Sequence, residues 1–232
     1  MEHQTQLIEA VKKGDLAKVR EFLDINGNAS RAKTEEGLSL ILLAIYYDHP
    51  AIARFIADRA GPLDIFEASA IGDTDRVRQI AENSPELVNS YGSDGFQPLG
   101  LACFFGHEEI ASLLIASGAE INSHSNNPQQ VMPLHSAVAG GHYEITRLLL
   151  ENGAYVNSRQ RGGFTPIHAA AQSGRPELVK LLVAHSADIN VRAESGKSAL
   201  DYARDGGHVE VMEYLRGRGA KSNPTKTNRP GL

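Results

Sequence analysis

The chain has 232 residues, of which 41% are hydrophobic and 22% are charged, so it can form a buried core and does not have the composition of a disordered protein. Its net charge of -5 predicts neither a basic surface for nucleic acid nor a polybasic membrane anchor. The first ten residues carry charges, and the longest apolar run, LSLILLAIYY, is much shorter than a membrane span, so we expect no secretory signal and no membrane helix. A single cysteine excludes an internal disulfide framework, and we expect a soluble protein of the cytoplasm.

One unit of the chain predicts a pair of short helices. It begins at Gly163 and reads GFTPIHAAAQSGRPELVKLLVAHSADIN. The hydroxyl of Thr165 can cap a helix, and Pro166 suits the first helical position because its missing N–H costs nothing there. Three small alanines follow, which would let a neighbouring helix approach closely. Gly174 ends this helix and Pro176 starts a second one, which carries the apolar residues of LVKLL.

The same unit recurs seven times, marked by an alanine five residues after the threonine position. The markers are Ala10, Ala44, Ala68, Ala102, Ala137, Ala170 and Ala203, and the successive intervals are 34, 24, 34, 35, 33 and 33 residues. The spacing predicts first helices of seven pairs near residues 6–13, 40–47, 63–71, 98–105, 133–140, 166–173 and 199–205.

The interval of 24 residues indicates a missing connection between the second and third repeats. The chain passes through Gly61 and Pro62 almost directly into the next helix, so we expect no projecting finger there. Residues 7–20 also align with residues 65–78 at an offset of 58. We therefore expect an N-terminal block of repeats 1–2 at residues 1–61 and a main block of repeats 3–7 at residues 62–220. The polar stretch 221–232, with two prolines, is expected to be disordered.

The motifs TPIHAA (165–170), MPLHSA (132–137) and QPLGLA (97–102) carry a resemblance to a known family. The chain resembles ankyrin-repeat proteins over about residues 5–220, and compact stand-alone bacterial members in particular. The resemblance implies an all-α solenoid of about seven helix-turn-helix repeats, with β-turn fingers along one edge. It also implies a concave surface that binds proteins.

Residue types that could support catalysis have structural interpretations here. His135 and His168 stand at the fourth position of the T-P-L-H motif, where the family uses the imidazole to hydrogen-bond the turn region. The turns between paired helices contain four more histidines, namely His49, His107, His142 and His208. Cys103 stands where the repeat has small residues, which predicts a buried, inert thiol. The chain contains no H-E-x-x-H, C-x-x-C or phosphate-binding glycine motif, so we expect no enzyme, metal or cofactor.

Two positions depart from the repeat in ways that affect local stability. Gly100 replaces the histidine of the motif in repeat 4, and Ser186 replaces the turn glycine found at Gly118 and Gly153. A serine held at positive φ would be strained.

Aromatic residues mark the candidate binding surface. In the family, the two residues before the turn lie on the concave face. Here they are Tyr46–Tyr47 and Phe104–Phe105, at equivalent places in the two blocks. One ring of each pair could instead pack on a neighbouring repeat, and the residues leave both alternatives open. Together with finger residues, the expected partner-binding set is Tyr46, Tyr47, Tyr91, Phe96, Phe104, Phe105, His124, Arg159, Arg161 and Phe164.

The function expected from these observations is that of a monomeric scaffold or adaptor, which binds another protein on its concave face and finger tips. We expect no nucleic-acid or membrane partner. Two alternatives remain at this stage. The chain could be a self-associating structural element with its aromatic pairs buried in a dimer, or a substrate-docking subunit of an enzyme complex.

Overall fold

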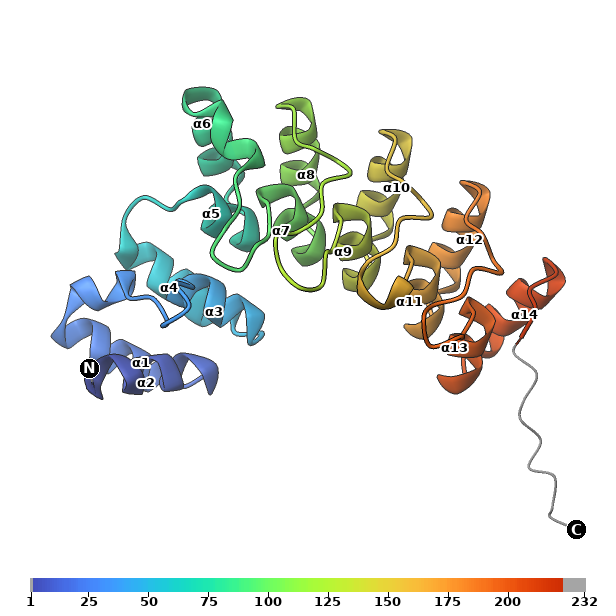
Figure 1. The fold of residues 1–232 in the computed structure, drawn as a ribbon. Coiled ribbons are helices and arrows are strands. Elements are labelled where there is room, and N and C mark those ends of the chain that lie inside the picture. Colours follow the sequence, from blue (N-terminus) through green and yellow to red (C-terminus); the bar gives the residue numbers. More distant parts are fainter. Residues whose placement is uncertain (1, 223–232) are drawn as a thin grey trace, which may run out of the picture.

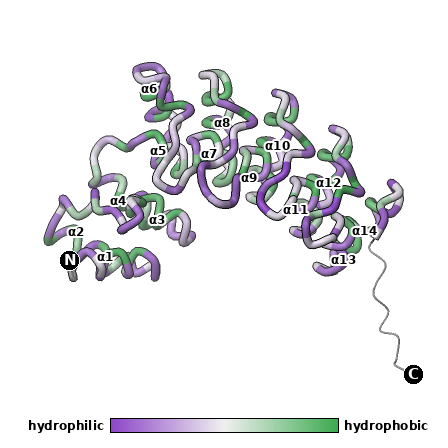
Figure 2. The backbone as a smooth tube through the Cα atoms, viewed as in Figure 1, coloured by the Kyte–Doolittle hydropathy of each residue, from purple (hydrophilic) through white to green (hydrophobic). Residues whose placement is uncertain are grey.

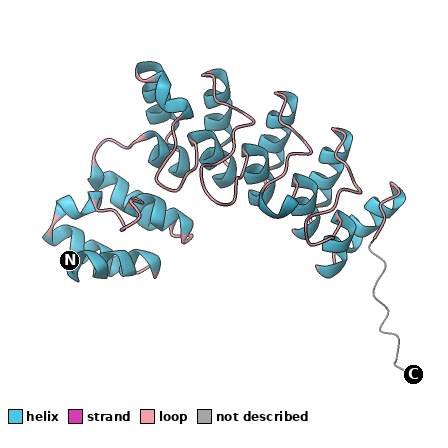
Figure 3. Cartoon of the chain, viewed as in Figure 1, coloured by secondary structure: helices cyan, strands magenta, loops and turns pink. Residues whose placement is uncertain are grey.

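The computed structural model describes residues 2–222 and shows a curved array of paired helices (Figure 1). Within this range the chain forms fourteen α-helices and no strand (Figure 3). The helices are α1 (Glu2–Lys12), α2 (Leu16–Ile25), α3 (Leu40–Tyr46), α4 (Pro50–Ala60), α5 (Ile65–Ile71), α6 (Thr74–Asn83), α7 (Pro98–Phe105), α8 (Glu108–Ala116), α9 (Pro133–Gly140), α10 (Tyr143–Glu151), α11 (Pro166–Gln172), α12 (Pro176–Ala184), α13 (Ala199–Asp205) and α14 (Val209–Gly217). The seven-pair, all-α fold expected from the sequence is confirmed. The expected disordered tail lies outside the described residues, apart from Lys221 and Ser222.

The odd-numbered helices are the inner helices, and their ends agree with the predicted ranges to within a few residues. The largest difference is at α1, which begins at Glu2 and not near residue 6. Helix α5 begins two residues later than expected because Asp64 caps it: the Asp64 carboxylate accepts from the Glu67 N–H at 2.8 Å, and the Glu67 carboxylate accepts from the Asp64 N–H at 3.1 Å.

All seven marker alanines are buried, and the inner helices pack against one another along the array. One hydrophobic core extends through the repeats from Leu7 to Leu215. Figure 2 shows the hydrophobic residues along the helices and hydrophilic residues in many of the connecting loops. Helices of seven to eleven residues are too short to be stable alone in water, so each depends on the neighbouring repeats.

Histidines in the turns join successive repeats. In each case Nε2 lies 2.9–3.1 Å from a backbone carbonyl of an earlier repeat; the pairs are His49–Lys12, His107–Ala70, His142–Phe104 and His208–Gln172. The imidazole lies directly beneath a turn glycine of that earlier repeat, as His142 does beneath Gly106. A Cβ at Gly106 would collide with the ring, and φ there is 85°, so glycine is required for both reasons.

Asparagines at the start of the fingers form a second series of links. Asn89, Asn122 and Asn157 each span from one repeat to the next. The Asn122 amide donates to the carbonyl of Gly153 at 3.0 Å, and its oxygen accepts from the N–H of Tyr155 at 2.8 Å. Because the pattern repeats, the later fingers are held to one another at a regular spacing.

The junction between repeats 2 and 3 lacks these links. Only residues 61–64 connect α4 to α5, so no finger projects there, as predicted. The turn position that holds histidine in repeats 2, 4, 5 and 7 is Asp73 in repeat 3, which instead caps α6 by accepting from the Arg76 N–H at 3.0 Å. Helix α4 packs against α5, and Figure 1 shows the first four helices turned relative to the later pairs.

Candidate functional site

Aromatic rings from repeats 2 and 4 meet across repeat 3. Tyr46 ends α3 and Phe105 ends α7, and their ring centroids lie 5.7 Å apart. The residue of α5 equivalent to Tyr46 is Ala70, which is small and 1% exposed. A larger side chain there would separate the rings, so the alanine allows a cluster that spans two repeat intervals.

Phe104 extends this cluster to the surface. Its ring meets that of Phe105 edge to face, with centroids 5.1 Å apart and an interplanar angle of 86°. This geometry is favourable for aromatic pairs. Phe105 is half-buried, whereas Phe104 is 42% exposed and Tyr46 is 37% exposed. One ring of the phenylalanine pair therefore packs inward, and the other faces solvent.

Tyr46 is also fixed by its hydroxyl, which donates to Oδ2 of Asp94 at 2.6 Å. The other carboxylate oxygen of Asp94 accepts from the Phe96 N–H at 3.0 Å. Burial, and then the hydrogen bond to Asp94, raise the pKa of Tyr46 far above its usual range, so the hydroxyl stays protonated and remains a donor. The ring of Tyr46 is thus held between α7 and the finger that precedes it.

The aromatic cluster borders a surface hollow where the inner helices turn into the outer ones. Its lining includes Tyr46, Phe104 and Phe105, together with the charged residues Asp48 and Arg54. Neither Asp48 nor Arg54 forms an ion pair with another residue in the described range. Burial lowers the pKa of His107, which also lines the hollow, so at neutral pH its imidazole is uncharged.

Comparison with known proteins places this geometry in a family. Two models of ankyrin repeats match residues 65–160 and residues 149–203, which together span more than half of the chain. The chain belongs to the ankyrin-repeat family. The first two helix pairs lie outside both matches, yet they have the same paired-helix architecture.

Individual relatives are similar over shorter stretches. The mouse protein named ankyrin repeat and SAM domain-containing protein 6 is 35% identical over 63 residues, 27% of this chain and 7% of the relative. The cattle SMC5-SMC6 complex localization factor protein 1 is 32% identical over 92 residues, 40% of this chain and 9% of the relative. The human counterpart is 33% identical over 85 residues, 37% of this chain and 8% of the relative. The matched stretches thus span less than a tenth of the length of these relatives. The relatives support membership of the ankyrin-repeat family. The resemblance to stand-alone bacterial proteins stays a prediction.

The other expected binding residues of repeats 2–4 lie outside the hollow. Tyr47 is 48% exposed and does not line it. Phe96 is half-buried and packs against the buried cluster of Leu42, Ala70 and Leu101, so much of its ring belongs to the ankyrin core. Tyr91 is exposed, and its hydroxyl donates to the carbonyl of His124 at 3.1 Å, which ties two neighbouring fingers together.

The expected residues on the later ankyrin fingers form no continuous site with the hollow. His124, Arg159 and Arg161 are exposed. Arg159 donates to the carbonyl of Arg192 at 3.4 Å. Phe164 is half-buried, because its ring stacks on His168 at 5.3 Å and meets Tyr202 edge to face at 5.2 Å. Its main contacts are therefore within the array.

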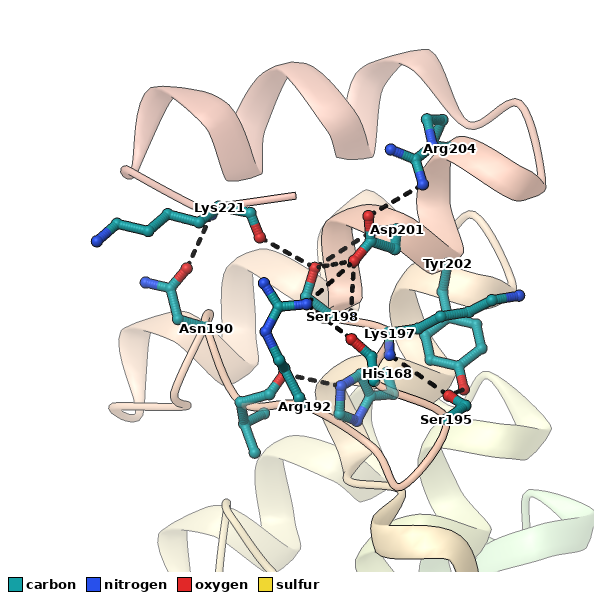
Figure 4. A network of polar contacts seen from close by, with 12 residues as sticks. His168, Asn190, Arg192, Ser195, Lys197, Ser198, Asp201, Tyr202, Arg204 and Lys221 are labelled. Carbon is teal, nitrogen blue, oxygen red and sulfur yellow. Dashed lines mark hydrogen bonds and ion pairs between the residues drawn. The ribbon is translucent and has the colours of Figure 1, made fainter. Parts of the chain in front are cut away.

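The fourth position of the ankyrin motif holds polar side chains that organise the inner helices. His168 accepts from the Thr165 N–H at 3.1 Å through Nδ1. Its Nε2 lies 3.1 Å from the carbonyl of Val191 (Figure 4). The equivalent residue in repeat 7 is Asp201, which the sequence analysis did not single out. Its buried carboxylate accepts from the Ser198 N–H at 3.0 Å and forms ion pairs with Arg204 at 3.0 Å and Arg192 at 3.6 Å. An acidic residue three positions after a serine is a capping-box signal that could have identified it.

The remaining candidates for chemistry have no reactive environment. Cys103 is fully buried, and burial raises the pKa of its thiol, so the thiol stays neutral. Residues 2–222 contain no cluster of three histidine, cysteine or acidic side chains suited to a metal ion. No helix in this part of the chain has the length and apolar character needed to cross a membrane.

Proposed function

We propose that this ankyrin array is a non-catalytic adaptor that binds another protein through its concave side and finger tips. Ankyrin repeats generally serve as protein-interaction modules, and the matches to that family support this class of function. The observation that carries the proposal is the aromatic cluster beside a surface hollow, in which Tyr46 and Phe104 are exposed and Phe105 is half-buried.

Two physical arguments support this position for the partner. Large rings bury much area with little loss of rotamer freedom, which is why they are enriched at interface hot spots. The rings of Tyr46 and Phe105 are also held by neighbouring repeats and by Asp94, so little ordering is needed on binding. Tyr47, Tyr91, Phe96, His124, Arg159, Arg161 and Phe164 would extend the contact along the array. The neutral buried thiol suits a reducing compartment such as the cytoplasm.

The test compares Phe104→Ala with the wild type in affinity capture from the native organism, followed by calorimetry with the captured partner. Loss of the exposed ring is expected to weaken binding by about 1–3 kcal/mol. Tyr155→Ala is the matched control, because Tyr155 is 64% exposed and lies outside the hollow. Cys103→Ser should lower stability more than affinity, since that side chain is buried. If Phe104→Ala binds as tightly as Tyr155→Ala, the partner uses another surface.

Self-association of the chain must be distinguished from binding of a different protein. In a dimer, the same aromatic rings would be buried against a second copy of the chain. Light scattering over a range of concentrations distinguishes the two, because only self-association gives a mass that rises with concentration. We propose the monomer, with the hollow open to a different protein.

A further inference from the structure

We infer that the hollow beside Phe104 accepts a cationic side chain, a lysine or an arginine, from a segment of the partner protein. This inference rests on the proposed function and specifies the chemistry of the partner. It is carried by the arrangement of three aromatic rings and the carboxylate of Asp48 around one opening, with a second carboxylate, Asp94, at the hydroxyl of Tyr46.

The rings provide the first half of the complementarity. Tyr46, Phe104 and Phe105 are tilted by 49° and 86° between neighbours, so they form a bent wall and not a flat stack. The face of an aromatic ring carries negative electrostatic potential, and a cation within about 6 Å of it is attracted. A carboxylate in the same place would be repelled by the ring faces.

The carboxylates provide the second half. Asp48 lies two residues after the end of α3 and lines the hollow without a cationic partner in the described chain. Asp94 lies at the hydroxyl of Tyr46, and its carboxylate accepts from that hydroxyl and from the Phe96 N–H, neither of which neutralises its charge. A cation seated among the rings would therefore share the hollow with the uncompensated carboxylate of Asp48, and Asp94 would add negative charge at the hydroxyl end of the Tyr46 ring.

Arg54 is the one opposing charge in the lining. It is exposed and belongs to α4, and its charge helps to lower the pKa of His107, which places it toward that side of the hollow. Asp48 follows Tyr46 by two residues in the chain, and Asp94 accepts from the Tyr46 hydroxyl, so both negative charges belong to the Tyr46 side of the hollow, whereas the positive charge of Arg54 lies towards His107. A cation bound beside the rings would be attracted by the carboxylate of Asp48 and repelled slightly by the guanidinium of Arg54.

This separation of charge can be tested, because removing the charge of Asp48 and removing the charge of Arg54 should change the binding affinity in different directions. A library of random 12-residue peptides displayed on phage is selected against the wild-type protein, and the tightest peptide is measured by fluorescence anisotropy on purified variants. We expect lysine or arginine to recur beside apolar residues in the selected peptides. Asp48→Asn should weaken binding about two- to five-fold, and Arg54→Gln should leave it unchanged or tighten it by up to about two-fold.

The variants are chosen to keep the fold intact. Asp48 has a φ of 59°, a conformation that asparagine tolerates as well as aspartate, so Asp48→Asn removes only the charge. Glu213→Gln is the matched control, because Glu213 is exposed at the far end of the array and makes the same change in net charge. Higher salt should also weaken the wild-type complex, by more than it weakens the Asp48→Asn complex.

The outcomes separate this inference from the proposed function. Tighter binding by Asp48→Asn together with weaker binding by Arg54→Gln would indicate an acidic ligand and overturn the cation inference. No effect of either variant, with weakened binding in Phe104→Ala, would also overturn it while the aromatic surface stands as a protein-binding site. If no selected peptide depends on Phe104, both the inference and the proposed function fail.

Discussion

A positive φ at a residue other than glycine marks a position where the repeat geometry strains the backbone. The turn after the outer helix has φ values of 88° at Gly118, 86° at Gly153 and 85° at Gly219, and the equivalent Ser186 is held at 69°. The sequence predicted strain at Ser186 because this serine stands where other repeats have a turn glycine, and the structure confirms the left-handed conformation there. Serine has a Cβ that disfavours this region, whereas glycine does not.

Ser186→Gly is therefore expected to stabilise the protein by roughly 0.5–1 kcal/mol. The Ser186 side chain is exposed, and the interaction that Asn157 makes there uses only the backbone carbonyl, so the change removes little else. Urea denaturation would show a higher midpoint with an unchanged m-value. Gly153→Ser is the reverse control and should lower the midpoint. An unchanged midpoint in both variants would mean that the turn relaxes around serine without strain.

His135 gives the protein a pH dependence. It is 2% exposed, and burial lowers the pKa of its imidazole from 6.5 to about 4, against a smaller upward effect of the backbone at Phe164 and Ser158. Between these two values the unfolded chain binds a proton that the folded chain does not. Stability is therefore lost as the pH falls from about 6.5 towards 4.

The expected loss due to His135 between pH 7 and pH 4 is about 2–3 kcal/mol, since each pKa unit corresponds to about 1.4 kcal/mol. Urea unfolding at several pH values measures it, and NMR titration of the imidazole gives the pKa directly. His135→Gln should flatten the dependence between pH 4 and 6.5, leaving the smaller contributions of His107 and His168, whose pKa values are also lowered by burial. A titration midpoint near 6.5 for His135 would refute the explanation.

Links between neighbouring elements explain why the later fingers are evenly spaced. Each finger asparagine makes one hydrogen bond through its nitrogen and one through its oxygen, and both partners are backbone groups of the next repeat. Backbone partners do not depend on which side chains the next repeat carries. The fingers can therefore vary in sequence while keeping their spacing, provided that the asparagine remains.

Asn122→Ala is expected to destabilise the array by about 1–2 kcal/mol, because it removes two hydrogen bonds and leaves the Tyr155 N–H and the Gly153 carbonyl without them. Asn126→Ala is the control, since the side chain of that exposed asparagine in the same finger makes no hydrogen bond within residues 2–222. Thermal or urea denaturation of both variants measures the difference. Equal stabilities would show that solvent replaces both bonds without cost.

At the scale of the whole molecule, the period of the sequence was sufficient to predict the seven helix pairs and the missing finger. Marker alanines and turn glycines reflect close packing of backbones, which every repeat requires. The aromatic site was only partly predictable. Tyr46 and Phe105 are distant in sequence, and their contact depends on Ala70 in a repeat between them. The rings of Phe96 and Phe164 were expected at the surface but pack largely within the array, because period alone does not show which way a finger side chain turns.

The junction between repeats 2 and 3 divides the stability of the array. It has no finger, and Asp73 stands where the histidines of repeats 2, 4, 5 and 7 bond the preceding repeat. In a linear array, stability is the sum of the repeats and their nearest-neighbour contacts, so a junction with fewer links opens first. The bond from Tyr46 to Asp94 partly compensates, because it connects repeat 2 directly to the finger of repeat 4.

We therefore expect α1–α4 to open as one unit, at a lower free energy than α7–α12. Hydrogen exchange followed by mass spectrometry at increasing urea should show a common step for residues 2–60 and a later one beyond residue 98. Tyr46→Phe removes the hydroxyl that Asp94 accepts from, and should lower the first step by about 1 kcal/mol while leaving the second unchanged. Tyr155→Phe is the control, because Tyr155 is exposed and its hydroxyl makes no hydrogen bond to the described part of the chain. A single step shared by all helices, or an equal effect of Tyr46→Phe on both halves, would show that the hydrophobic core alone couples the two blocks, despite the missing links at residues 61–64.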